Sequence, residues 1–161
     1  MNLGAVSLVD RVCIVTGAGS GIGRATAMLL AERGASVIVA DVAECGADVQ
    51  REIAAGGGRA EFVQGDVCES EYSQQLVDAT MERFGRLDAL VNNAGILRLA
   101  DSFELTTDAQ MEETMRVNFH AVFSLSKVAV PALEASGHGS IVNTASMVGY
   151  RIGMPGHAVY G

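Results

Sequence analysis

The clearest chemical signal in the sequence is a glycine-rich segment of eight residues, Thr16–Gly23, with the spacing G-x-x-x-G-x-G. It follows the apolar run Val12–Val15 and precedes a stretch with a helical pattern. Glycine lets the chain turn sharply, and backbone N–H groups at the start of the helix can then approach a pyrophosphate. The residues predicted to bind these phosphates are Gly17, Ser20, Gly21, Ile22 and Gly23. A tight strand-to-helix turn without a ligand also uses glycine, so the segment alone leaves that alternative open.

Asp41 lies at the end of the next apolar run, Ser36–Ala40. A carboxylate at this place can accept hydrogen bonds from both hydroxyls of an adenosine ribose. It would repel a 2′-phosphate, and neither Ser20 nor segment 42–44 supplies an Arg or Lys to hold one. The expected cofactor is therefore NAD(H), and NADP(H) is disfavoured. The alternative is a strand-end acid that caps the following helix.

The segments that must position these residues alternate between two hydrophobic periods. Short runs rich in apolar residues predict strands at Val12–Val15, Ser36–Ala40, Ala60–Val63, Leu87–Val91 and Ser140–Asn143. Helical patterns occupy Gly21–Arg33, Glu44–Ala55, Ser70–Phe84 and Thr107–Ala135. This alternation predicts right-handed crossovers and an α/β fold. The expected architecture is a Rossmann-type, doubly wound parallel sheet of about five strands, with helices covering both faces.

The ends of the helices are predicted by individual residues. Thr107 and Gln110 have the spacing of a capping box, in which each side chain satisfies the backbone N–H of the other. Residues that tolerate positive φ follow three of the helices, at Gly34, Gly56–Gly58 and Gly85. Pro131 lies inside the last helical stretch, where it removes an N–H donor. We expect a kink or an early end of the helix there.

The composition excludes several classes of protein. A chain of 161 residues with 49% hydrophobic and 19% charged residues suits one globular domain. The net charge of −8, without a basic stripe, disfavours nucleic acid and anionic membranes as partners. The three cysteines lack a C-x-x-C pair, and no zinc-ligand spacing is present, so no metal is expected. No basic segment followed by an apolar run begins the sequence, and a cytoplasmic location is expected.

Further motifs follow the glycine-rich segment in a fixed order. They are Asp66-Val67, Asn92-Asn93-Ala94-Gly95, Asn118, Ser146 and Tyr160. With these motifs, nearly the whole chain resembles the short-chain dehydrogenases/reductases. The resemblance implies that Asp66 and Val67 flank the adenine and that Asn93 borders the cofactor. Taken alone, the Asn92–Gly95 motif could equally be a plain turn.

The chemistry that the resemblance implies is hydride transfer between NAD(H) and a secondary alcohol or ketone. Tyr160 would exchange a proton with the substrate oxygen, although a free phenol has a pKa near 10. In the family, a Lys four residues after the Tyr lowers that pKa. Ser146 would hold the substrate oxygen, and Asn118 would hold a water leading to the Lys. Without the resemblance, Ser146 could end a strand, Asn118 could be a polar helix residue, and Tyr160 could be a surface aromatic.

The fourth position after Tyr160, where the resemblance implies a Lys, lies beyond Gly161. We expect residues 1–161 to be the NAD(P)-binding, amino-terminal portion of a longer enzyme, impaired in turnover as it stands. The longer enzyme would be a homo-oligomer with a small-molecule substrate. Two other functions stay open: an NADPH-dependent 3-oxoacyl-thioester reductase, and a nucleotide-binding module without catalysis.

Overall fold

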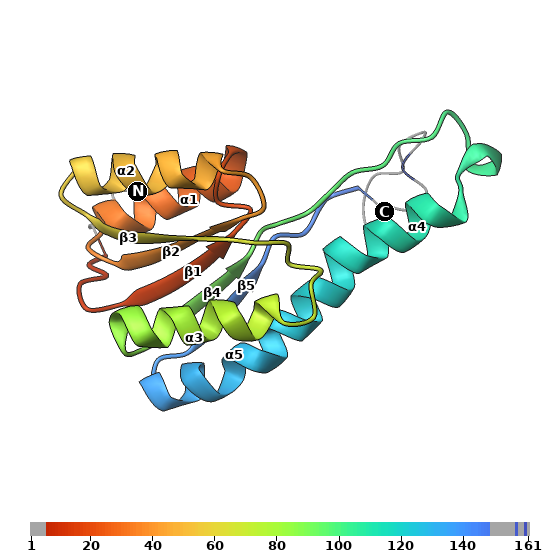
Figure 1. The fold of residues 1–161 in the computed structure, drawn as a ribbon. Coiled ribbons are helices and arrows are strands. Elements are labelled where there is room, and N and C mark those ends of the chain that lie inside the picture. Colours follow the sequence, from red (N-terminus) through yellow and green to blue (C-terminus); the bar gives the residue numbers. More distant parts are fainter. Residues whose placement is uncertain (1–5, 149–156, 158–159, 161) are drawn as a thin grey trace.

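The structure is a computed structural model that describes residues 6–148, 157 and 160. Its centre is a parallel sheet with the strand order β3-β2-β1-β4-β5 (Figure 1). The strands are β1 (Val12–Thr16), β2 (Ser36–Asp41), β3 (Arg59–Gln64), β4 (Ala89–Asn92) and β5 (Ser140–Asn143). The α-helices are α1 (Gly21–Glu32), α2 (Cys45–Ala55), α3 (Tyr72–Phe84), α4 (Asp108–Met115) and α5 (Val122–Ser136). The predicted α/β, Rossmann-type doubly wound fold is confirmed.

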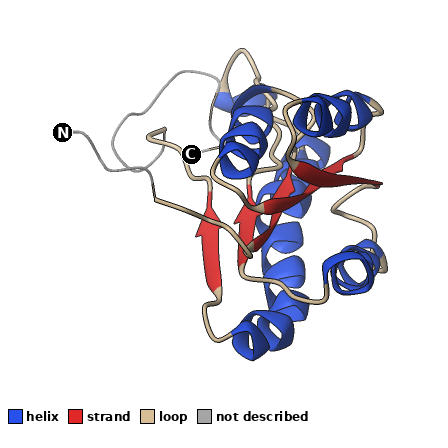
Figure 2. Ribbon diagram, turned by 90° about the vertical axis from the view of Figure 1, so that its left-hand side faces the viewer, coloured by secondary structure: helices blue, strands red, loops and turns tan. Residues whose placement is uncertain are grey.

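Helices cover both faces of the sheet, as Figures 1 and 2 show. Alternate residues of the central strands point to opposite faces, which is why β1 and β2 are apolar along their length. On one face Val15 and Val39 pack with the buried sides of α1 and α2. On the other face Ile14 packs with α3 and α5 through Leu76 and Leu125.

The strand order reverses between β1 and β4, and this reversal determines where a ligand can bind. The chain moves outward from β1 to β2 and β3, then returns to place β4 on the other side of β1. The loops that leave β1 and β4 therefore diverge to opposite faces and open a crevice at the carboxyl ends of these strands. The glycine-rich segment leaves β1 at this place.

Local signals at the helix ends agree with the prediction. The Thr107 hydroxyl accepts a hydrogen bond from the Gln110 backbone N–H at 3.2 Å, and the Gln110 side chain accepts one from the Thr107 N–H at 2.9 Å. Positive φ angles occur at Gly34, Gly57 and Gly85, where α1, α2 and α3 have ended. The capping box and the three glycine stops are confirmed.

Pro131 does not end its helix, so the expected early end is wrong. The helix α5 continues to Ser136, and Pro131 lies on its exposed side, as does Lys127. The Pro131 nitrogen cannot donate to the Lys127 carbonyl, but the buried residues Ala129 and Leu133 hold the helix on the sheet. The irregular part of this stretch lies earlier, at the π-helical segment Arg116–Ala121 between α4 and α5.

The edge strand β5 also departs from the expectation of strands covered on both faces. All four of its residues are exposed, with Val142 at 52%. In the described part of the chain β5 pairs only with β4, because it lies at the end of the sheet. The helix α5 packs against α3 and contacts both β4 and β5.

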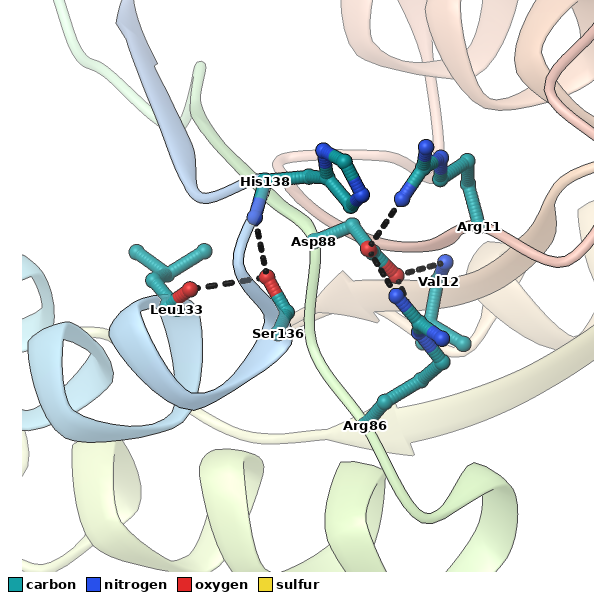
Figure 3. A network of polar contacts seen from close by, with 7 residues as sticks. All are labelled: Arg11, Val12, Arg86, Asp88, Leu133, Ser136 and His138. Carbon is teal, nitrogen blue, oxygen red and sulfur yellow. Dashed lines mark hydrogen bonds and ion pairs between the residues drawn. The ribbon is translucent and has the colours of Figure 1, made fainter.

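The amino-terminal ends of β1 and β4 are joined by a buried carboxylate, Asp88 (Figure 3). It accepts hydrogen bonds from Arg11 at 3.0 Å, from both Arg86 donors at 2.6 and 2.8 Å, and from the Val12 N–H at 3.0 Å. Burial by itself would raise the pKa of Asp88, but these hydrogen bonds and charges outweigh it and lower the pKa from 3.8 to about 2. Asp88 thus stabilises the sheet at the end opposite the glycine-rich segment.

Residues 6–148, 157 and 160 contain neither a candidate membrane span nor a candidate metal cluster. None of the helices found there is both long and apolar enough to pass through a bilayer. Within the same residues, no group of three or more His, Cys, Asp and Glu side chains gathers in a way that could hold a metal ion.

Candidate active site

A cavity of about 1280 Å³ opens at the carboxyl ends of the strands. It gathers side chains from the loops after β1, β2, β3, β4 and β5 and from the helical arm, by which we mean α4, the π-helical segment and α5. The predicted site residues that line it are Gly17, Ser20, Gly21, Ile22, Asp41, Asp66, Val67, Asn93, Asn118, Ser146 and Tyr160. Residues as far apart in sequence as Gly17 and Tyr160 therefore share one space. Gly23 is the predicted site residue that does not line it.

At the end of the glycine-rich segment, the N-terminus of α1 borders this cavity without a side-chain cap. Ser20 occupies the N-cap position of α1, but its side chain makes no capping hydrogen bond, and the first turn holds no acidic residue. Gly21 has φ +52°, and a Cβ built on it would meet no atom within 4 Å. Free N–H groups and the helix dipole together favour an anion at this position. The residues present therefore fit a pyrophosphate.

Gly17 and Gly23 have a packing role that explains why they cannot carry a side chain. A Cβ on Gly23 would lie 2.1 Å from the Gly17 carbonyl oxygen and 2.5 Å from the Asn93 side chain. A Cβ on Gly17 would lie 2.9 Å from the Ala94 Cα. Because Gly17 and Gly23 lack a Cβ, α1 can pack close to β1 and to the turn after β4. Gly23 therefore affects the shape of the cavity although it does not line it.

Asp41 is oriented by two backbone donors. One carboxylate oxygen accepts a hydrogen bond from the Gly19 N–H at 2.8 Å, and the other accepts one from the Ala43 N–H at 2.9 Å. The N-cap of α2 is Glu44, whose side chain makes no capping hydrogen bond, so Asp41 does not cap α2. Each Asp41 oxygen keeps a lone pair, which leaves the carboxylate able to accept ribose hydroxyls.

The loop after β3 forms the next part of the wall, with Gly65, Asp66 and Val67. A Cβ on Gly65 would lie 2.2 Å from the ring of Tyr72, so this ring fixes the path of the loop. The Tyr72 hydroxyl donates to the Val63 carbonyl at 2.7 Å. Burial, assisted by the charge of Asp41, raises the pKa of Tyr72 and keeps it neutral.

The turn after β4 braces the glycine-rich segment. The Thr16 hydroxyl oxygen accepts hydrogen bonds from the backbone N–H groups of Asn93 and Ala94, both at 3.0 Å. The Asn93 side-chain amide donates to the Thr16 carbonyl at 3.1 Å. Asn93 lines the cavity, and its amide nitrogen donates to the loop that follows β1.

The side chains of Asn92, Asn143 and Ser126 form a second polar cluster next to this turn, which the sequence did not predict. The Asn92 side chain is buried and donates to Ser126 on α5 at 3.1 Å and to Asn143 on β5 at 2.9 Å. Asn92 and Asn143 are register partners at the last positions of their strands. Only the register could have revealed this pair, because the two residues are 51 positions apart.

Asn118 lies in the π-helical segment and faces the loop after β4. Its amide nitrogen donates to the Ile96 carbonyl at 2.9 Å, and its oxygen accepts from the Ile96 N–H at 2.9 Å. These two hydrogen bonds hold the loop against the helical arm. They leave one N–H and one oxygen lone pair of the amide unused.

Ser146 and Tyr160 line the same cavity from the chain that follows β5. The Ser146 hydroxyl oxygen accepts a hydrogen bond from the Val148 N–H at 3.2 Å, which leaves its proton available to a ligand oxygen. The Tyr160 N–H donates to the His157 carbonyl at 3.0 Å, and the two rings lie 6.3 Å apart. The structure thus brings the two predicted reacting groups to one space.

The fold is doubly wound, and the glycine-rich segment and the hydroxyl groups of Ser146 and Tyr160 line one cavity at the carboxyl ends of its strands. The sequence matches the family described as short chain dehydrogenase over residues 11–161. The chain belongs to this family of oxidoreductases, whose members bind nicotinamide cofactors.

Three relatives show how far the similarity extends. An uncharacterized oxidoreductase of Thermotoga maritima is 44% identical over 151 residues, which are 93% of this chain and 59% of that protein. A cyclohexanol dehydrogenase of Acinetobacter sp. (strain SE19) is 42% identical, over 87% of this chain and 56% of that protein. A 3-oxoacyl-(acyl-carrier-protein) reductase, FabG, of Thermotoga maritima is 36% identical, over 95% of this chain and 62% of that protein. The chain thus spans about three fifths of the length of these relatives.

Proposed function

We propose that this chain forms the cofactor-binding part and two reacting groups of an NAD(H)-dependent oxidoreductase that acts on a secondary alcohol or ketone. The observation that supports this most directly is the shared cavity. The open terminus of α1, the Asp41 carboxylate, and the hydroxyl groups of Ser146 and Tyr160 all line it. A protein that only bound nucleotide would have no need of the last two groups beside the site.

Each residue has a role that follows from its position. The nicotinamide cofactor supplies or accepts the hydride. The N–H groups at the start of α1 bind the pyrophosphate, and Asp41 accepts hydrogen bonds from the ribose. Ser146 donates a hydrogen bond to the substrate oxygen and stabilises the charge that develops there. Tyr160 takes the hydroxyl proton when the alcohol is oxidised and returns it when the ketone is reduced.

Asp41 is the basis for the choice of NAD(H) over NADP(H). Its two oxygens are held by the Gly19 and Ala43 N–H groups, so the carboxylate cannot easily turn away from the ribose. A 2′-phosphate would meet this fixed negative charge. Val42, the next residue in the cavity wall, offers no cation to balance it.

The walls beyond the nucleotide site favour an apolar substrate. Phe119, Val122 and Phe123 of the helical arm and Ile96 and Leu97 after β4 line this part of the cavity. An alicyclic secondary alcohol suits such walls, and the Acinetobacter relative is a cyclohexanol dehydrogenase. The Thermotoga reductase supports a second candidate, an NADPH-dependent reductase of 3-oxoacyl thioesters.

The test follows deuterium from the cofactor into the product, which detects even slow turnover. The chain is incubated with cyclohexanone and NADH deuterated at its transferable position, and cyclohexanol is analysed by mass spectrometry. We expect deuterated cyclohexanol, with transfer reduced about a hundredfold or more by Tyr160→Phe and about a hundredfold by Ser146→Ala. Asp48→Asn, which removes an exposed charge outside the cavity, is the control and should have no effect.

Two results would contradict the proposal. If NADH binds but no deuterium is transferred above the level without protein, the chain is a nucleotide-binding module. If deuterated NADPH reduces a 3-oxoacyl thioester faster than NADH reduces cyclohexanone, the second candidate is correct.

A further inference from the structure

Gly19 lies against the Asp41 carboxylate, although it is not one of the glycines that define the spacing G-x-x-x-G-x-G. It is buried and does not line the cavity. Its φ angle lies outside the left-handed region, whereas Gly17 and Gly21 both have a positive φ. The backbone conformation at position 19 therefore does not require glycine.

Two side chains fill the space that a Cβ at position 19 would occupy. An ideal Cβ would lie 2.6 Å from the Cys45 sulfur, 2.9 Å from one Asp41 carboxylate oxygen and 3.0 Å from the carboxylate carbon. Each distance is shorter than van der Waals contact, so these side chains would have to move. Cys45 is the exposed first residue of α2. The contact with the Asp41 carboxylate remains whichever way the Cys45 thiol turns.

The backbone of Gly19 also orients this carboxylate. The Gly19 N–H donates to the Asp41 Oδ2 at 2.8 Å, and the preceding N–H, of Ala18, donates to the Ala40 carbonyl at 3.1 Å. Two adjacent N–H groups of the segment thus meet two adjacent residues at the end of β2. The oxygen that Gly19 holds is the same oxygen that a Cβ would crowd. A side chain at position 19 would therefore disturb the hydrogen bond that orients Asp41.

We propose that Gly19 is a positioning residue for cofactor selectivity. Because it lacks a Cβ and donates its N–H, it holds the Asp41 carboxylate in the orientation that accepts ribose hydroxyls and repels a 2′-phosphate. This proposal rests on the proposed function, in which Asp41 meets the ribose, whereas the contacts of Gly19 with Asp41 are independent of any ligand. A displaced carboxylate would lose hydrogen bonds to the ribose and would oppose a 2′-phosphate less, since repulsion falls with distance.

The experiment measures the dissociation constants of NAD⁺ and NADP⁺ at one salt concentration by ligand-observed NMR titration, which detects weak binding. We expect the wild-type chain to bind NAD⁺ at least about tenfold more tightly than NADP⁺. Gly19→Ala should weaken NAD⁺ binding about fivefold and change NADP⁺ binding less than about twofold, so that the preference falls to about twofold. A general disturbance of the glycine-rich segment would instead weaken both dinucleotides equally, because both carry the same pyrophosphate.

Gly56→Ala is the matched control. Gly56 follows α2 with φ −78°, and a Cβ there would meet no atom closer than 3.5 Å. This variant should leave both dissociation constants within about twofold of the wild type.

A double variant keeps the test decisive if Gly19→Ala alone does not fold. Gly19→Ala with Cys45→Ala removes the contact with the sulfur and keeps the contact with the carboxylate, so it should show the same lowered preference. Cys45→Ala alone should keep the wild-type preference, because Asp41 retains both of its backbone donors. Full recovery of the preference in the double variant would refute displacement of the carboxylate.

A second readout needs no nucleotide. The Ala43 N–H donates to the other Asp41 oxygen, so its amide signal in a ¹⁵N–¹H correlation spectrum reports the place of the carboxylate. Both Asp41→Asn and Gly19→Ala should shift this signal, and Gly56→Ala should not. An unshifted Ala43 signal in Gly19→Ala would contradict the proposal.

The outcomes distinguish this proposal from the proposed function. If the wild-type chain prefers NAD⁺ and Gly19→Ala keeps the same preference, the role of Gly19 is refuted and that of Asp41 stands. If Gly19→Ala weakens both dinucleotides equally, positioning of the carboxylate is refuted. If the wild-type chain prefers NADP⁺ or binds neither dinucleotide, both proposals fall.

Discussion

Replacing Asp88 with Asn should destabilise the protein in a way that depends on pH. Asp88 is the buried acceptor for Arg11, Arg86 and the Val12 N–H, and its side chain is only 4% exposed. Its pKa is lowered from 3.8 to about 2, and each pKa unit is worth about 1.4 kcal/mol. The ionised carboxylate therefore contributes about 2 kcal/mol to the free energy of unfolding at neutral pH.

The sign of the pH dependence follows from the lowered pKa. The stabilisation is complete above the pKa of the unfolded state, near 4, and is lost as the pH falls toward 2. About half of it should remain at about pH 3. Asp88→Asn has no carboxylate to protonate, so its free energy of unfolding should approach that of the wild type as the pH falls.

Urea unfolding followed by circular dichroism, at several values between about pH 7 and about pH 3, measures this difference. Asp78→Asn is the control, because Asp78 is an exposed acid that accepts a hydrogen bond from the exposed side chain of Gln74. A free energy of unfolding for Asp88→Asn within about 0.5 kcal/mol of the wild type at neutral pH would refute this role of Asp88, as would an equal deficit at acidic pH.

Three further changes have effects that the structure predicts. Gly23→Ala should lower the free energy of unfolding by about 2 kcal/mol and weaken nucleotide binding, because its Cβ would lie 2.1 Å from the Gly17 carbonyl oxygen. Urea unfolding and NADH titration measure the two effects, and near-normal NADH binding would contradict the prediction. Tyr72→Phe should lose about 1 kcal/mol at neutral pH through the Val63 hydrogen bond. Since burial raises the pKa of Tyr72, the wild type should also lose stability above about pH 10, and an equal alkaline loss in the variant would contradict this. Thr107→Ala should lower the free energy of hydrogen-exchange protection in the first turn of α4 by about 1 kcal/mol. Thr106→Ala is the control, because the Thr106 hydroxyl donates to the Ser102 carbonyl and does not cap α4. Equal losses in the two variants would refute the role of the capping box.

The sequence predicted the features that depend on neighbouring residues. Short runs rich in apolar residues located all five strands, and β5 has the predicted bounds. The capping box at Thr107 and the glycine after each of α1, α2 and α3 follow from backbone preferences that act within one turn. Such preferences need no knowledge of the fold.

The features that the sequence did not predict depend on distant contacts. The Asn92–Asn143 hydrogen bond requires the register of β4 against β5. The continuation of α5 past Pro131 requires the packing of Ala129 and Leu133 on the sheet. Likewise, Asn118 could be singled out by resemblance, but its engagement with the Ile96 backbone appears only in three dimensions.

The central claim is that this cavity is an NAD(H) site in which Asp41 selects against a 2′-phosphate. The most direct test is the ratio of the dissociation constants of NAD⁺ and NADP⁺, measured for the wild-type chain and for Asp41→Asn by titration at one salt concentration. We expect the wild-type chain to bind NAD⁺ at least about tenfold more tightly, a difference of about 1.4 kcal/mol, and Asp41→Asn to reduce this preference severalfold. Equal or tighter binding of NADP⁺ by the wild-type chain, or binding of neither dinucleotide, would contradict the account.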